Sequence, residues 1–380
     1  MPQSDQFNRR TRGFLAILQS ARGERGSAIA LKHISHHGTR LIMLAGKVVF
    51  TISEASCCEM PAGPVLLGGV DFIELDMNNA TRMPWVDTAK GLSIILVVMM
   101  YAAYNTGEYT GGVGFLHYVI GFATPFRMPE FFLISGLFLS QVIDRPLRRY
   151  VDRRVVHYLY FYVLWAIISI GLKIGIYSRD LDQMLHDLAW AVVEPYGVLW
   201  FIYMLAVFGI VIRLLRELRA PHWVVIPIAA GLQMWAPRPD SYALEQFAAY
   251  FVFFYVGFVI APLVFRLVAW TQERPALAVA GLLAWAVVNG LLVYSPGYSV
   301  QPTETQMGFA AWPPLHLALA VAGALALCVL GGFLSKFASM EWLRWLGEHS
   351  LVVYVAFTIP MSLFRGAALS SGLLTDTGWL

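Results

Sequence analysis

The sequence predicts an all-α protein that crosses a membrane several times. Of its 380 residues, 58% are hydrophobic and only 13% are charged, whereas soluble domains carry about 25% charged residues. The hydrophobic residues form repeated runs of about 20, which is the length that an α-helix needs to cross the hydrocarbon core. The charged residues gather in short clusters between these runs. Together these observations predict a polytopic helical bundle.

The first part of the chain differs from the rest. Residues 1–80 contain scattered arginines, several glycines and the segment HISHHG. The apolar run 41–52 is too short to span a membrane. We therefore expect a poorly ordered or non-native extension over residues 1–80, with Met77 and Met83 as alternative starts. A membrane domain over residues 81–380 follows it.

From Gly91 onward, the hydropathy pattern predicts about nine membrane spans. The first and fifth are short, and the first needs the segment near Trp85 to reach across. The second is interrupted by Pro125 and Pro129, because proline removes a helical hydrogen bond. The expected spans are 91–105, 116–141, 155–177, 198–215, 222–236, 247–269, 276–295, 312–334 and 350–369.

The loops between the expected spans alternate between many and few basic residues. Twelve lie in one set of loops, and only Arg179 and Arg238 lie in the other set. Because cytoplasmic loops are enriched in lysine and arginine, this pattern places the N-terminus and the loop 145–154 in the cytoplasm and the C-terminus on the other side. No eukaryotic retention or lipidation signal is present, which favours a bacterial inner membrane.

Several function classes lack support in the sequence. The net charge is only +3, and no basic tract indicates a nucleic-acid partner. Neither a glycine-rich phosphate loop nor a Gly-x-Ser-x-Gly motif is present. Cys57, Cys58 and Cys328 have no spacing typical of a zinc site. We expect neither a bound cofactor nor a metal.

Two ionisable residues lie within an expected span, and such residues are functional candidates because their burial is costly. Arg127 and Glu130 are three residues apart and share a helix face. They could form an ion pair that locks the broken helix. Alternatively, they could line a cavity and hold a polar or anionic substrate. The two interpretations are compatible.

A basic cluster precedes the third expected span. The segment RPLRRYVDRRVVHY contains five arginines and His157. It could simply fix the topology by contacting anionic lipid headgroups. It could instead bind a phosphorylated donor, because the guanidinium group matches phosphate oxygens in a bidentate manner.

Four motifs, in order over about residues 82–369, resemble the acyltransferase family 3 of integral membrane acyltransferases. The first motif lies in the segment RMPWVDTAKG, directly before an apolar helix. The second reads MPEFFLISG, the third LWFIY and the fourth LGEHSLVVY. The positions that carry them are Arg82, Asp87, Lys90 and Gly91, then Met128, Pro129, Ser135 and Gly136, then Trp200, and finally Ser350 and Tyr354.

The resemblance implies a bundle of about ten spans that passes an acyl group from a cytoplasmic acyl thioester, of the acyl-CoA type, to a hydroxyl of a glycan or lipid-linked acceptor. Members that modify glucans look closest. The sequence departs from the family at three positions. Tyr101 replaces the presumed catalytic histidine, Phe357 replaces a second frequent histidine, and an Arg-x-x-Arg pair reads Arg154-x-x-His157.

On this resemblance the residues expected to bind the donor are Arg82, Asp87, Lys90, Arg153, Arg154 and His157. Of these, Asp87 and Lys90 also order the cytoplasmic mouth. Tyr101, Arg127 and Glu130 are the expected catalytic residues.

A tyrosine is a poor base at neutral pH, so the base must lie elsewhere. Glu130, Glu108 and His117 are the sequence candidates for this role.

Two alternatives to the enzyme remain open. One is a catalytically silent relative that transports or helps to assemble a glycan or lipid, which the missing histidine favours. The other is a truncated, non-functional copy. The acyl group, the acceptor and the oligomeric state are not predicted.

Overall fold

The computed structural model describes residues 31–36, 39–44, 47–53, 83–177, 181–235 and 241–371. The chain divides into two units, Met1–Arg82 and Met83–Leu380. In the first unit, β1 (Leu31–His36), β2 (Thr39–Leu44) and β3 (Lys47–Ser53) form an antiparallel sheet in the order β1-β2-β3. Apart from these strands, the extension expected over residues 1–80 lies outside the described residues.

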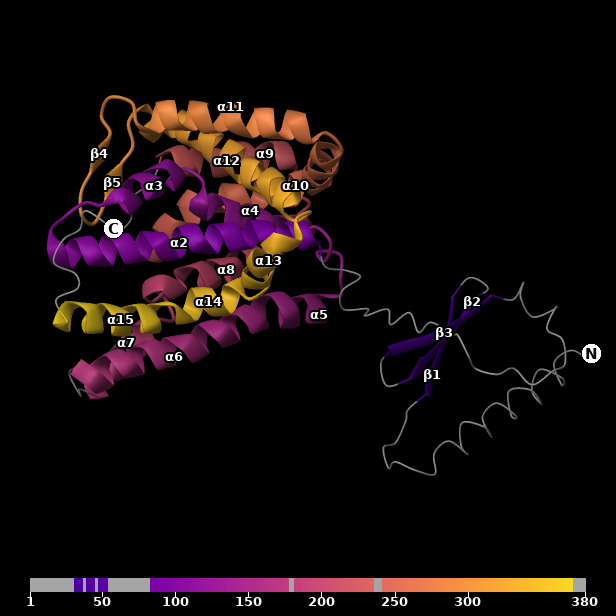
Figure 1. The fold of residues 1–380 in the computed structure, drawn as a ribbon. Helices are drawn as coiled ribbons and strands as arrows, with labels where there is room; N and C mark the ends of the chain where they lie inside the picture. Colours follow the sequence, from indigo (N-terminus) through magenta and orange to yellow (C-terminus); the bar gives the residue numbers. More distant parts are fainter. Residues whose placement is uncertain are drawn as a thin grey trace, which may run out of the picture. The chain divides into compact units, whose positions relative to one another are not determined.

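The second unit is a helical bundle, which confirms the predicted all-α membrane class (Figure 1). One short antiparallel hairpin, β4 (Ser299–Val300) and β5 (Thr305–Gln306), joins two of its helices. The helices are α2 (Pro84–Thr110), α3 (Phe115–Ala123), α4 (Arg127–Leu139), α5 (Leu147–Val151), α6 (His157–Tyr177), α7 (Leu181–Trp190), α8 (Trp200–Glu217), α9 (His222–Trp235), α10 (Tyr242–Glu273), α11 (Pro275–Val293), α12 (Pro313–Leu334), α13 (Glu341–Glu348), α14 (Ser350–Ala356) and α15 (Thr358–Ser370).

Among the described residues, six helical segments are long and apolar enough to cross a membrane. The pair Ser350–Ala356 and Thr358–Ala368, bent by 47°, can add a seventh. Three of the nine expected spans therefore take a different form. The ninth is this bent pair, and the second is divided into α3 and α4. The fifth is α9, whose 14 residues fall short of the roughly 20 that a crossing needs.

The break in the second expected span lies at one of its two prolines. The helix is interrupted at residues 124–126, which include Pro125. Pro129 instead lies in the first turn of α4, where a missing backbone N–H costs nothing because it has no helical partner. Arg127 and Glu130 consequently begin a new helix inside the bundle.

Glycines allow α4 and α10 to pack with their backbones in contact. A Cβ atom on Gly136 would lie 2.1 Å from the carbonyl oxygen of Phe254. A Cβ atom on Gly257 would lie 2.2 Å from that of Leu133. Small residues permit this close approach in membrane helices, where packing replaces the hydrophobic effect. The motif glycine Gly136 is therefore a packing residue at the centre of the bundle.

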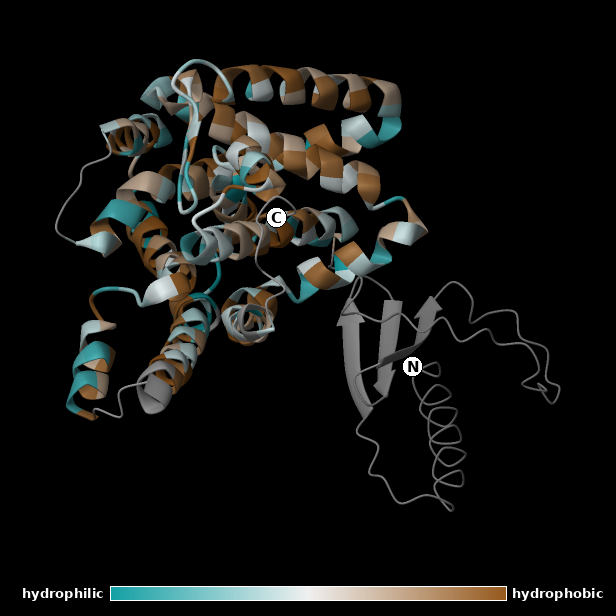
Figure 2. Cartoon of the chain, turned by 60° about the vertical axis from the view of Figure 1, so that its left-hand side comes forward, coloured by the Kyte–Doolittle hydropathy of each residue, from teal (hydrophilic) through white to brown (hydrophobic). Residues whose placement is uncertain are grey.

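The outside of the bundle is apolar, as a lipid-facing surface must be (Figure 2). Large side chains such as Trp223, Trp235 and Leu363 are more than 70% exposed. A soluble domain would bury side chains of this kind, whereas lipid tails solvate them.

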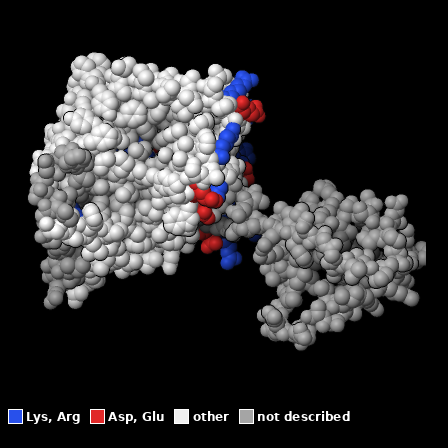
Figure 3. All heavy atoms as spheres, viewed as in Figure 1, with Lys and Arg blue, Asp and Glu red and all other residues white. Residues whose placement is uncertain are grey.

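Charged side chains gather at one end of the bundle on the face drawn in Figure 3. We call this the charged end. It contains the first turns of α2 and α5 and the last turns of α8, α10 and α12. Arg216 and Asp144 form an ion pair there, and Arg344 pairs with Glu341 at 2.5 Å. The twelve basic residues that the sequence assigns to one side include Arg216 and Arg344.

Candidate functional site

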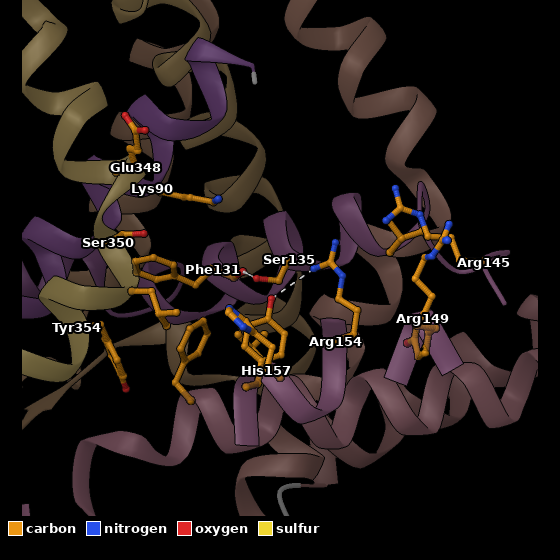
Figure 4. Close-up of a pocket in the computed structure, with 17 residues that line it drawn as sticks. Lys90, Phe131, Ser135, Arg145, Arg149, Arg154, His157, Glu348, Ser350 and Tyr354 are labelled. Carbon is orange, nitrogen blue, oxygen red and sulfur yellow. Dashed lines mark hydrogen bonds between the residues drawn. The ribbon is translucent and has the colours of Figure 1, made fainter. Parts of the chain in front are cut away.

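A cavity of about 420 Å³ opens at the charged end (Figure 4). We call it the arginine pocket. Lys90, Arg145, Arg149 and Arg154 line it together with a single carboxylate, that of Glu348. Its charged lining is therefore strongly positive, and its volume lies in the range of small-molecule sites. The other polar lining residues are Ser135, Tyr150, His157, Tyr158, Ser350 and Tyr354.

Two motif glycines bring the walls of the arginine pocket together. A Cβ atom on Gly91 would lie 2.3 Å from the carbonyl oxygen of Leu343, and one on Gly347 would lie 1.6 Å from that of Asp87. Helices α2 and α13 can therefore cross only because both residues are glycines. This crossing places Lys90 opposite Ser350 at the pocket wall.

The arginine side of the pocket is built on an irregular helix. Between α5 and α6, residues Asp152–Val156 form a π-helical turn. Such a turn holds more residues than an α-turn and often occurs at functional sites, because it re-aims the side chains around it. Arg154, which lies in this turn, donates to the Tyr158 hydroxyl at 3.3 Å and to the Phe138 carbonyl at 3.4 Å.

Lys90 also contacts Phe138, through the aromatic ring of that residue. Its ammonium nitrogen lies 5.4 Å from the centre of the Phe138 ring. Two cations from helices more than 60 residues apart in sequence thus flank one phenylalanine. Both contacts leave the positive charge of the side chain in place, so they add positive charge to the wall of the pocket.

A second cavity, of about 470 Å³, lies further along the bundle. We call it the aromatic pocket. Tyr101, Trp200 and Tyr242 supply three rings, and Glu194 is the one charged residue among the lining residues of this cavity. Tyr101 follows Lys90 by 11 residues, which is about 16 Å along an α-helix. The two cavities therefore lie at different depths of the bundle.

Neighbouring residues hold two side chains of the aromatic pocket in place, those of Tyr101 and Glu194. The Trp200 side chain acts on the Tyr101 hydroxyl. Since the indole N–H only donates, it leaves the proton of Tyr101 available. On the opposite wall, the backbone N–H of Ala243 donates to Oε2 of Glu194 at 3.0 Å.

Tyr354 separates the two pockets. It lines the arginine pocket, and its hydroxyl donates to the carbonyl oxygen of Val198, which lines the aromatic pocket. Tyr101 packs beside this boundary, with its ring centre 5.2 Å from that of Phe357. The two positions where the resembled family has histidine are therefore in contact with each other, and both hold an aromatic ring.

Arg127 and Glu130 do not pair. Both carboxylate oxygens of Glu130 and the Nη1 atom of Arg127 are buried, and none has a hydrogen-bond partner among the described residues. Tyr104, Tyr250 and Tyr101 surround Arg127, whereas Lys90 acts electrostatically on Glu130. The ion pair considered from the sequence is absent, because a shared helix face does not decide which neighbours two long side chains meet.

The predicted residues thus divide into several groups. Lys90, Arg154, His157, Ser135, Ser350 and Tyr354 line the arginine pocket, whereas Tyr101 and Trp200 line the aromatic pocket. Arg127 and Glu130 line neither, so the predicted residues do not share one continuous cavity. Asp87, Gly91, Met128, Pro129 and Gly136 also line neither of them. Arg82 and the side chain of Arg153 lie outside the described part of the chain.

Sequence reasoning missed Glu194 and Tyr242. Glu194 precedes the LWFIY motif by only a few residues, which is the one signal that could have drawn attention to it. Tyr242 begins α10, far along the chain from Tyr101. Among the residues described, no group of three or more His, Cys, Asp and Glu side chains could hold a metal ion.

Comparisons with known proteins agree with the sequence motifs. Residues 83–379 match the family model described as "Acyltransferase domain". The chain is also similar to the inner membrane protein YcfT of Escherichia coli (strain K12), with 23% identity over 184 residues. This match covers 41% of the chain and 50% of YcfT, so the chain matches about half the length of that relative. No solved structure matches the chain.

Proposed function

Because the chain belongs to this acyltransferase family, we propose that it transfers an acyl group from a phosphorylated acyl thioester, of the acyl-CoA type, to a hydroxyl of an envelope glycan or a related acceptor. In this proposal the donor occupies the arginine pocket and the acceptor occupies the aromatic pocket. One observation carries it. A strongly positive cavity and an aromatic cavity with one carboxylate meet at a single tyrosine, Tyr354.

The lining of the arginine pocket suits the phosphates of such a donor. Arg149 and Arg154 present guanidinium groups, which bind phosphate oxygens in a bidentate manner. Lys90 adds a point charge from the opposite wall, and His157 lies at the same pocket. Arg82, Asp87 and Arg153 remain proposed donor contacts on the basis of the family motifs alone. The thioester end of the donor would then extend past Tyr354.

The catalytic groups lie on the other side of Tyr354. The free proton of Tyr101 can be donated to the oxyanion that forms as the acceptor attacks the thioester carbon. Arg127, which interacts with Tyr101, supplies positive charge near the same position. Glu130 interacts with Lys90 and would influence the donor side instead.

The proposal includes an orientation. The charged end faces the cytoplasm of a bacterium, and the aromatic pocket opens toward the other side of the inner membrane. The arginines of the charged end support this arrangement, and YcfT is an inner membrane protein.

The test is acyl transfer by the purified protein in lipid bilayers. A radiolabelled acyl-CoA is supplied with a panel of glycan acceptors, and we expect label in at least one acceptor together with free thiol. Correctly folded protein that consumes no thioester with any acceptor would refute the proposal.

That negative result would favour a second function, which is transport or assembly of a glycan or lipid without catalysis. The contact between Tyr101 and Phe357 favours it, because neither position retains an imidazole.

A further inference from the structure

We propose that Glu194 is the general base of the acyl transfer and that the aromatic pocket binds a saccharide hydroxyl against it. This inference rests on the proposed function. It supplies the proton acceptor that Tyr101 cannot provide, and it assigns this role to a residue outside the family motifs.

The candidates expected from the sequence are poorly placed for this role. His117 is buried, with one ring nitrogen bonded to the backbone N–H of Gly114 at 3.1 Å and the other 3.1 Å from the carbonyl oxygen of Pro302. Glu108 is exposed and lines neither pocket. Glu130 is fully buried and also lines neither.

Glu194 has the position that a base needs. It lines the same cavity as Tyr101, and its carboxylate is half-buried rather than sealed within the bundle. The Ala243 N–H holds Oε2, which leaves Oε1 to accept a proton from a ligand in the pocket. Titratable groups near it include Tyr101 and Tyr242 in the pocket, and Tyr203, which interacts electrostatically with Glu194. Glu245 acts electrostatically on Tyr242 from the first turn of α10.

The segment that carries Glu194 is held at both ends. The Tyr162 hydroxyl donates to the carbonyl oxygen of Ala191 at 2.5 Å and accepts from the backbone N–H of Tyr196 at 3.2 Å. Tyr203 donates to the carbonyl oxygen of Val192 at 3.3 Å. A catalytic group must be held by its surroundings to act efficiently, and these bonds provide that support.

The lining of the pocket indicates the chemical class of the ligand. Aromatic rings offer apolar faces on which the C–H faces of a sugar ring can pack, and the carboxylate accepts hydrogen bonds from hydroxyl groups. No cation lines this cavity among the described residues, so an anionic acceptor would lack a counter-charge. These features favour a neutral saccharide.

The proposed step conserves atoms and charge. Oε1 of Glu194 takes the proton of the acceptor hydroxyl as the hydroxyl oxygen forms a bond to the thioester carbon. The carbon–sulfur bond then breaks, and the thiolate leaves through the arginine pocket, where it takes a proton from water. Glu194 returns its proton to water at the mouth of the aromatic pocket.

The test compares Glu194→Gln with Glu245→Gln in lipid bilayers. Glutamine keeps the oxygen that accepts from Ala243 but is not a base, so it preserves the fold while removing the proton acceptor. Glu245 is an exposed glutamate on the first turn of α10 that lines neither pocket but acts electrostatically on Tyr242. Glu245→Gln is therefore the matched control for the loss of a negative charge near the aromatic pocket. Steady-state transfer from labelled acyl-CoA to a neutral glycan is measured against pH.

We expect Glu194→Gln to lower kcat about 10²–10⁴-fold and to alter the dependence of the rate on pH. Binding of a non-reactive CoA thioester analogue should be unchanged, which reports an intact fold and arginine pocket. Glu245→Gln should remain within about twofold of the wild type.

The outcomes separate the two proposals. An active wild type with an equally active Glu194→Gln variant, and the same pH profile, would overturn the role of Glu194 and leave the acyltransferase proposal standing. A wild type that binds the analogue but transfers to no acceptor would overturn both.

Discussion

The two pockets of this protein are of similar volume but of opposite character. The arginine pocket is lined by four cations and one carboxylate, whereas the aromatic pocket has one carboxylate and no cation among its described lining residues. Both border the same helix, α2, and they meet at Tyr354. A bundle can thus hold two ligands of different chemistry within about 16 Å of helix. Under the proposed function, each substrate would select its pocket by charge.

The interactions that hold the walls of the two pockets in place differ as well. The arginine pocket depends on backbone contact between α2 and α13, which glycine alone permits. The aromatic pocket depends on side-chain interactions, of Trp200 with Tyr101 and of Tyr162 with the segment before α8. We therefore expect single substitutions to disable one pocket and spare the other.

The largest expected effect is that of Gly347→Val. The new side chain would overlap the carbonyl group of Asp87 and force α13 away from α2. We expect a loss of about 3 kcal/mol or more in stability, measured as a lower melting temperature in detergent, together with loss of CoA binding. Gly231→Ala on α9, where a Cβ atom meets nothing within 4 Å, is the control and should be neutral. A Gly347→Val protein with unchanged stability would disprove the close contact.

The second prediction concerns charge in the arginine pocket. Removing Arg149 and Arg154 together should raise the KM for acyl-CoA about 10²–10⁴-fold, because hydrogen bonds to charged groups contribute about 1.5–3 kcal/mol each. The KM for the acceptor should not change. Arg266→Ala removes an exposed charge on α10 that lines neither pocket, and it should have little effect. An equal rise in both KM values would show that the pockets are not separate.

The third prediction is the counterpart in the aromatic pocket. Tyr242→Ala should raise the KM for the glycan acceptor about 3–10-fold, as expected for the loss of one aromatic contact. Donor binding should stay constant. Tyr160→Ala on α6, an exposed tyrosine that lines neither pocket, provides the comparison. If Tyr242→Ala weakens donor binding but leaves the KM for the acceptor unchanged, the acceptor binds outside the aromatic pocket.

The smallest effect is expected at the boundary between the pockets. Tyr354→Phe removes the hydrogen bond to Val198 and should lower the free energy of unfolding by about 0.5–1.5 kcal/mol. The phenylalanine ring would still separate the cavities. Tyr354→Ala should let water reach the thioester, which is measured as acyl-CoA hydrolysis without acceptor. Equal hydrolysis by the Ala and Phe variants would indicate that the ring does not close the passage.

The sequence by itself determined the class of the protein and much of its arginine pocket. Hydropathy runs and the distribution of arginines are local properties, so they can be read without knowing which helices touch. The motifs located Lys90, Ser135 and Tyr354, and the basic cluster before the third expected span located Arg154. The fold brings all four residues to one cavity. The span count was less certain, because Pro125 divides one span and α9 is short.

Only the tertiary structure decided how the remaining residues combine. It placed Tyr101 in a different pocket from Lys90, left Arg127 and Glu130 unpaired, and brought Glu194 beside Tyr101 across 93 positions of the chain. Such contacts depend on how each helix is rotated about its axis and how closely its neighbours approach. A π-helical turn at Arg154 and glycines at helix crossings set those quantities here, and neither is visible in a hydropathy pattern.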